Sequence, residues 1–230
     1  FRPWLHYRLQ FSRDNVRLGQ VTDGSGVDFN DFYFDAVRFI KIFPRAGKFN
    51  VPFNREQLNP GSALLLVERS IVNSEFSYGR KIGAALYGLL GDHVAYGGSV
   101  FISPTFEDAT DASTINSEVF AGRIQLNFGG KLEYGNGHFP TGGDYALVPN
   151  FTNVPTFVSG MALLYFPSLS VKENDNDSGA LVERFIELGI EKGDVVSVTA
   201  DVAYKLPSFN FEAAYIGRWI DPEIGGGANV

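Results

Sequence analysis

Apolar and polar positions alternate with a period of two near the end of the chain. Apolar residues occupy positions 196, 198, 200, 202 and 204, and the alternation restarts after Pro207 and runs to Ile220. Two such runs of about eleven residues predict an antiparallel hairpin with a short turn. A tilted bilayer crossing needs strands of about 9–11 residues, whereas strands of soluble proteins typically have about 5–6. The hairpin therefore indicates a wall with one apolar and one polar face, which favours transport over catalysis.

Segments with the same alternation recur along most of the chain. They cover residues 5–12, 28–40, 42–53, 81–90, 93–103, 120–128, 131–134 and 156–166, and with the closing hairpin they predict about ten strands. Short turns such as Gly91-Asp92 join some strands and long polar loops join others, which is typical of outer-membrane barrels. No linker divides the chain. Residues 1–230 are therefore predicted to form a single all-β domain, a transmembrane antiparallel β-barrel that is incomplete at both ends.

Two segments interrupt the alternation. Residues 54–77 are predicted to form a loop that folds into the barrel lumen, and within it Ser62–Val72 is predicted to be a short helix with Ser62 as N-cap. Residues 168–194 are predicted to form a second long loop. Leu181, Phe185 and Leu188 have helical spacing there, so we expect a short helix in this loop too.

The composition narrows the class of protein. The chain has no cysteine, which excludes thiol catalysis, disulfides and cysteine-based metal sites. No apolar run approaches 18 residues, so the sequence contains no candidate transmembrane helix. The formal net charge of -7 disfavours nucleic acid as a partner. The 26 glycines and 21 phenylalanines suit a curved sheet with aromatic residues at a membrane interface.

The sequence predicts neither an enzyme nor a metal or cofactor site. His6, His93 and His138 are scattered, with no acidic or histidine partner at ligand spacing. Residues 174–179 resemble the start of a calcium loop, but Phe185 stands where such a loop needs a glutamate. No nucleophile motif is present.

Basic residues at the polar positions of the strands are candidates for lining a pore. The alternation places six of them on polar faces: Arg8, Lys48, Lys81, Arg123, Lys205 and Arg218. They could attract anions and replace part of their hydration. Alternatively, they only make the lumen generally polar, and Asp35, Asp201 and Glu212 balance their charge. The strand pattern leaves both interpretations open, because a dedicated anion site needs several cations at one depth.

A second group of charged residues surrounds the predicted inward loop. Arg55, Glu68, Arg69 and Arg80 are candidates for shaping a constriction. The alternative is that ion pairs among such residues pin the loop to the wall. Both roles are compatible with the sequence.

One part of the chain resembles a known family. The segments RAGKFNVPFNREQL (45–58), VERSIVN (67–73) and GRKIG (79–83) resemble motifs of the phosphate-selective O/P-type porins, and residues 31–98 carry the resemblance. The closing hairpin, Asp201–Pro222, looks like a late strand pair of the same family. Asn50 departs from the motif, in which a lysine is common at this position. The resemblance implies a sixteen-stranded outer-membrane barrel, usually a homotrimer, whose inward loops narrow the pore.

The sequence therefore predicts a porin of the Gram-negative outer membrane. It would let small hydrophilic solutes or ions, including anions such as phosphate, diffuse passively, with lipid and further copies of the chain as partners. One alternative is a structural barrel with a plugged lumen that serves as an envelope anchor or assembly partner. Another is a secreted, soluble β-sandwich that binds a ligand, whose apolar rows would face a shared core.

Overall fold

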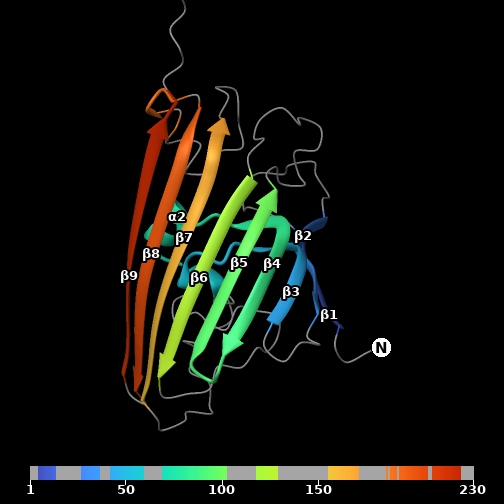
Figure 1. Cartoon of the computed structure of the whole chain (residues 1–230), viewed down its shortest axis with the longest axis vertical. Coiled ribbons are helices and arrows are strands. Elements are labelled where there is room, and N and C mark those ends of the chain that lie inside the picture. Colours follow the sequence, from blue (N-terminus) through green and yellow to red (C-terminus); the bar gives the residue numbers. More distant parts are fainter. Residues whose placement is uncertain are drawn as a thin grey trace, which may run out of the picture.

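In a computed structural model the chain folds into one antiparallel sheet (Figure 1). The structure describes residues 5–13, 27–36, 42–59, 69–102, 118–128, 155–170, 185, 187–190, 192–206 and 209–223. In this part of the chain the sheet has nine strands, each paired with its neighbours in the sequence. They are β1 (Leu5–Arg13), β2 (Val27–Ala36), β3 (Ile42–Asn50), β4 (Arg80–Leu90), β5 (Val94–Ile102), β6 (Glu118–Phe128), β7 (Thr156–Ser170), β8 (Lys192–Leu206) and β9 (Phe209–Pro222). The all-β prediction is confirmed.

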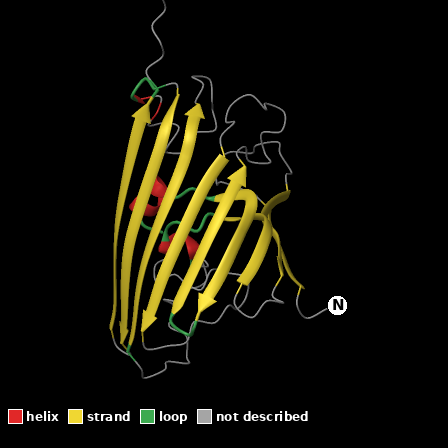
Figure 2. Ribbon diagram, in the orientation of Figure 1, coloured by secondary structure: helices red, strands yellow, loops and turns green. Residues whose placement is uncertain are grey.

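Two short helices lie between β3 and β4 in the sequence and on one side of the sheet (Figure 2). Helix α1 (Arg55–Leu58) begins at Asn54, whose side chain accepts a hydrogen bond from the Glu56 amide. Helix α2 (Ile71–Phe76) begins at Ser70, whose side chain accepts from the Asn73 amide. Such caps satisfy amides that have no partner within a helix. We call residues 51–59 and 69–79 the inner segment.

The sheet has two different faces because successive strand residues point to opposite sides. The face that carries the inner segment, here the concave face, holds buried residues such as Tyr87, Arg123 and Asp201. The opposite, convex face carries exposed large apolar residues such as Leu86 and Met161. The concave face combines an apolar cluster with buried charged and polar residues. An exposed apolar row on the other face differs from a soluble antiparallel sheet, whose second face is polar.

Aromatic side chains pack on the concave side of β2–β5. The ring of Phe49 lies 5.0 Å from that of Phe101 and 6.2 Å from that of Tyr33, measured between centroids. Within this cluster Arg45 donates two hydrogen bonds to Asp35, at 2.7 and 2.8 Å, and its guanidinium lies 3.9 Å from the centroid of the Tyr33 ring. Both charges are buried, so the pair and the rings form one packed unit that joins β2 to β3.

The structure changes several predicted boundaries. Strands β7 and β8 have 15 residues each and β9 has 14, so all three are longer than expected. Strand β7 reaches Ser170, which shortens the predicted loop 168–194, and Phe185 within that loop is buried. Ile71 and Val72 begin a helix that Ser70 caps, and the predicted cap Ser62 lies outside the described residues. Residues 60–68 and the predicted strand 131–134 lie outside the described residues.

Candidate functional site

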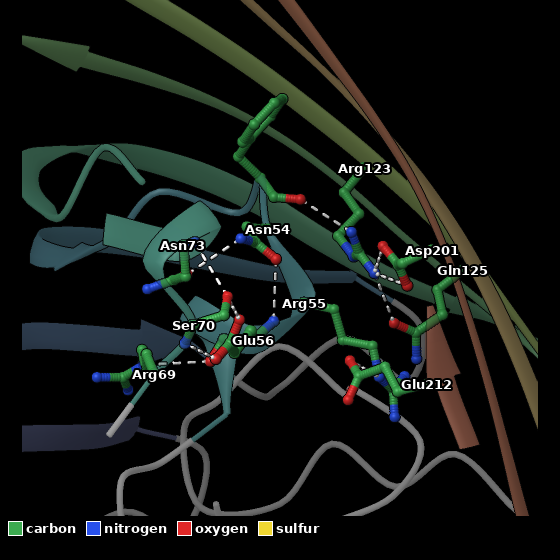
Figure 3. Close-up of polar contacts among 11 residues, drawn as sticks. Asn54, Arg55, Glu56, Arg69, Ser70, Asn73, Arg123, Gln125, Asp201 and Glu212 are labelled. Atoms are coloured by element: carbon green, nitrogen blue, oxygen red, sulfur yellow. Dashed lines mark hydrogen bonds and ion pairs between the residues drawn. The ribbon is translucent and has the colours of Figure 1, made fainter. Parts of the chain in front are cut away.

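Side-chain hydrogen bonds hold the two helices of the inner segment together (Figure 3). The Glu56 carboxylate accepts hydrogen bonds from the amide and the hydroxyl of Ser70, both at 2.6 Å. The Asn54 amide donates to the Asn73 side chain at 3.0 Å, and Asn73 donates to Gln57 at 3.1 Å. Asn54 and Ser70 are also the two caps, so the same residues that begin the helices also join them.

Arg69 closes the inner segment on itself. Its guanidinium donates to the carbonyl oxygens of Glu56, at 3.3 Å, and Asn59, at 3.0 Å. Burial lowers the pKa of Arg69, the positive charge of Arg80 lowers it further, and Glu56 opposes both effects. Arg69 is thus a partner of the backbone at the end of α1.

The inner segment is attached to β8 and β9 at both of its ends. The hydroxyls of Tyr78 and Ser197 lie 2.5 Å apart, and Arg218 donates to the Tyr78 hydroxyl at 3.2 Å. Near the start of the segment, Arg55 lies 3.6 Å from the Glu212 carboxylate. The Tyr78 ring also packs against Phe166 of β7, with centroids 5.2 Å apart. The segment therefore lies directly on the wall formed by β7–β9.

A third attachment comes from β6. Arg123 donates to both carboxylate oxygens of Asp201, each at 2.8 Å, and to the carbonyl oxygen of Phe53 at 2.9 Å (Figure 3). Both side chains of the pair are completely buried. Removing either partner would leave an uncompensated buried charge, which typically costs about 3–5 kcal/mol.

The structure brings four of the six predicted pore-lining cations to the concave face. Directly paired residues of neighbouring strands point to the same side, so Arg8 lies with Tyr33, Lys81 with Phe49, and Arg218 with Ser197. Arg123, the fourth, lies there too, in the pair with Asp201. Only the backbone of Lys205, in β8, is described.

The predicted position of Lys48 is wrong. Lys48 pairs with Phe32 on one side and Ile82 on the other, and Phe32 is exposed on the convex face. The next residue, Phe49, points inward and is buried. Phe43 and Phe49 of β3 are buried in one cluster with Val51, Phe53 and Leu58 of the inner segment, so on this strand these apolar residues do not mark the outer side.

Two predicted site residues are too deeply buried to face water. Arg123 is covered by Phe53 and paired with Asp201, so it does not line an open passage. Arg55, predicted at a constriction, is 1% exposed and next to Glu212. In both cases an acid lies next to the arginine, Asp201 beside Arg123 and Glu212 beside Arg55.

Of the other predicted constriction residues, one lies on the sheet, one lies in the inner segment and one lies outside the described residues. Arg80 donates to Asp31 at 2.7 Å, and Arg8 lies 3.4 Å from the same carboxylate. Arg8 and Arg80 each keep 31% of their side-chain surface exposed, so they are the cations of this cluster that water reaches. Arg69 belongs to the inner segment, and Glu68 lies outside the described residues.

Sequence reasoning missed several residues that build this site. Asp31 and Arg45 occupy inward positions of β2 and β3, and their alternation with Phe32 and Ala46 was a usable signal. Gly160 lies within β7, beneath the Arg123–Asp201 pair. A glycine within a strand often marks a close approach of another group.

Two rows of aromatic residues cross the convex face of β6–β9. In the register of the sheet, one row consists of Phe128, Phe157, Tyr204 and Phe211, and the other of the aromatic residues Phe120, Tyr165 and Trp219 with Val196 between the last two. The rows lie eight residues apart on every strand, which is about 27 Å along a strand at ~3.4 Å per residue. Exposed apolar residues such as Ile124, Met161 and Leu163 lie between them. The convex face is thus an apolar band with aromatic borders.

Charged residues lie beyond one of these borders. Asp194 and Asp221 pair with each other two residues past the row that contains Trp219, and Lys192 forms an exposed ion pair with Glu223 nearby. The sequence of apolar band, aromatic row and charged rim therefore follows the strands from their middle to one end.

We also searched the described residues for a metal site and for a membrane-spanning helix. Among them, no three His, Asp or Glu side chains converge in a way that could hold a metal ion. No helix in the described part of the chain is long and apolar enough to span a membrane. Comparisons of the chain with protein-family models, with curated proteins and with solved structures gave no match.

Proposed function

We propose that this chain forms part of the wall of a bacterial outer-membrane β-barrel porin, through which small hydrophilic solutes and ions diffuse passively. The observation that carries the proposal is an exposed apolar convex face opposite a concave face that holds buried charged and polar residues, such as Arg123, Gln125 and Asp201, beside an apolar cluster. Transmembrane barrels have this arrangement, with lipid outside and a polar interior. The chain would act by size exclusion and lumenal charge, with no chemical step.

The aromatic rows support a lipid-facing convex surface. Barrel strands tilt by about 35–45°, so about 27 Å along a strand corresponds to roughly 20 Å across the bilayer. Outer-membrane barrels carry an apolar band of about 25 Å between two aromatic girdles. A soluble sandwich would instead need a second layer over these residues, and in the described part of the chain nothing covers them.

We also propose that the pore prefers anions and that the protein forms trimers, because the sequence resembles O/P-type porins. The exposed side chains of Arg8 and Arg80 support an anion preference, because the two cations share one nearly buried carboxylate, Asp31. This local excess of positive charge would raise the concentration of anions at the concave face.

A second candidate function rests on the inner segment. The burial of Arg123 and the contacts of Arg55 and Tyr78 with the wall favour a barrel whose lumen is plugged on this side. A fully plugged barrel would serve as an envelope anchor or assembly partner instead of a channel.

Single-channel recording separates the two candidates. The full chain, inserted in a planar bilayer, should give stepwise openings, and a salt gradient should give a reversal potential that favours anions. Replacing Arg8 and Arg80 by glutamine should shift that potential towards cations, whereas the convex-face variant Lys48→Gln should leave it unchanged. The porin function is refuted if membrane-inserted protein gives no openings, and the plugged barrel then becomes the better account.

A further inference from the structure

The Arg123 guanidinium connects three separate parts of the chain. Arg123 belongs to β6, the carboxylate that it binds belongs to Asp201 of β8, and the carbonyl oxygen belongs to Phe53 of the inner segment. One nitrogen, Nη2, bonds both carboxylate oxygens, and the other, Nη1, points to the segment. The side chain is therefore both part of the wall and the attachment point of the segment.

The wall leaves room for this connection at Gly160. In the register of the sheet, Gly160 of β7 lies between Gln125 of β6 and Asp201 of β8. To reach Asp201, the Arg123 side chain must cross β7 here. A Cβ added at Gly160 would overlap the guanidinium and would lie 2.8 Å from Asp201 Oδ1. The absent side chain is thus what permits the pair to form.

The Phe53 carbonyl lies next to the residue that links the two helices of the inner segment. The next residue, Asn54, is the cap of α1 and also donates to Asn73 of α2. Fixing the backbone at Phe53 therefore fixes the position of both helices. The other attachments are longer or more exposed. Arg55 lies 3.6 Å from Glu212, and Arg218 donates to the Tyr78 hydroxyl and to the Glu75 carbonyl at 3.2 Å each, the latter at an exposed site. The bond from Arg123 is shorter, at 2.9 Å, and fully buried, where a charged donor is worth more.

We propose that Arg123 and Asp201 are positioning residues, which hold the inner segment against β6–β9 and thereby set how much of the concave side is open to solutes. Asp201 orients the guanidinium and balances its charge, and Arg123 holds Phe53. Gly160 provides the space. The effect on solutes rests on the proposed porin function, whereas the position of the segment does not.

Spin labelling measures the position of the segment directly. The chain has no cysteine, so Val72→Cys, at a half-exposed site of α2, introduces a single attachment point for a nitroxide. Spectra of the full chain in lipid vesicles would be compared with and without Asp201→Asn. A hydrogen bond with a charged donor stabilises by an amount equal to roughly 10- to 100-fold in an equilibrium constant. We expect the ratio of mobile to immobile label to rise by about this factor.

Two further variants make the result decisive. Gly160→Ala keeps both charges but displaces the guanidinium, so it should also release the label, and it replaces Asp201→Asn if that variant does not fold. Asp35→Asn breaks the other buried pair, between β2 and β3, and should leave the label immobile. An immobile label in both Asp201→Asn and Gly160→Ala would overturn the proposal, and so would equal release by Asp35→Asn, which would indicate general loosening.

Conductance of the same variants tests the consequence for solutes. Asp201→Asn should change the single-channel conductance or its open-state noise, and Asp35→Asn should not. If the label is released but no variant conducts, the positioning role stands and the porin function fails. If the channel conducts and the label never moves, the porin function stands and the positioning role fails.

Discussion

Met161→Arg tests whether the convex face contacts lipid. Met161 is 62% exposed and lies midway between the aromatic positions Phe157 and Tyr165 of β7, four residues from each. Four residues span about 14 Å along a strand, so at a tilt of about 40° the side chain lies roughly 10 Å below each border of the band. An arginine at the bilayer midplane of a barrel costs about 2–4 kcal/mol, but near the interface only about 0–1 kcal/mol.

The control is the same substitution at a border. Val196 lies in the aromatic row that contains Tyr165, so Val196→Arg should cost about 1 kcal/mol or less by depth alone. Reversible urea unfolding of the full chain in lipid vesicles would give both free energies. We expect Met161→Arg to be less stable than Val196→Arg by about 2 kcal/mol. Two results would refute a lipid-facing band. One is an equal loss of stability in the two variants. The other is a change in the free energy of unfolding within ~0.5 kcal/mol for Met161→Arg, as at an ordinary water-facing position.

Two stability predictions concern the concave face of β2 and β3. Asp35→Asn removes one partner of a buried pair and should lower the free energy of unfolding in urea by about 3–5 kcal/mol. Glu223→Gln, in an exposed pair, should lower it by less than ~1 kcal/mol. Similar costs for the two variants would contradict the inference that burial makes the Asp35–Arg45 pair important. Gly47→Ala should destabilise more than Gly79→Ala in the same assay. Both glycines have positive φ, but only at Gly47 would the new Cβ meet backbone, 2.6 Å from a Cα of β2, so the reverse order would disprove a steric cause.

The alternation along the chain predicted the strands well because a period of two is a local property. For example, Ile124 of β6 and Tyr215 of β9 stand at apolar positions of the alternation, and both are exposed on the convex face. The inference failed at Lys48 because the pattern distinguishes two faces but does not say which is outside. On β3 the more apolar face is covered by the inner segment and points inward.

The site itself was harder to predict because its contacts are not local. Arg123 and Asp201 are 78 residues apart, and Arg123 and the carbonyl of Phe53 are 70 apart. The sequence offers several acids for each arginine, and only the register of β6, β7 and β8 decides which pair meets. The predicted cap Ser62 lies outside the described residues. The caps that the structure shows, Asn54 and Ser70, also make side-chain contacts with the other helix, and no local pattern indicates such contacts.

The consecutive pairing of the strands constrains how the sheet could become a ring. Each of the nine described strands runs opposite to its neighbour, so β1 and β9 run in the same direction. Bringing these two edges together would create one parallel pair, whereas an antiparallel ring needs an even number of strands. An odd number of additional strands must therefore stand between β9 and β1 in a closed antiparallel barrel, whichever polypeptide supplies them.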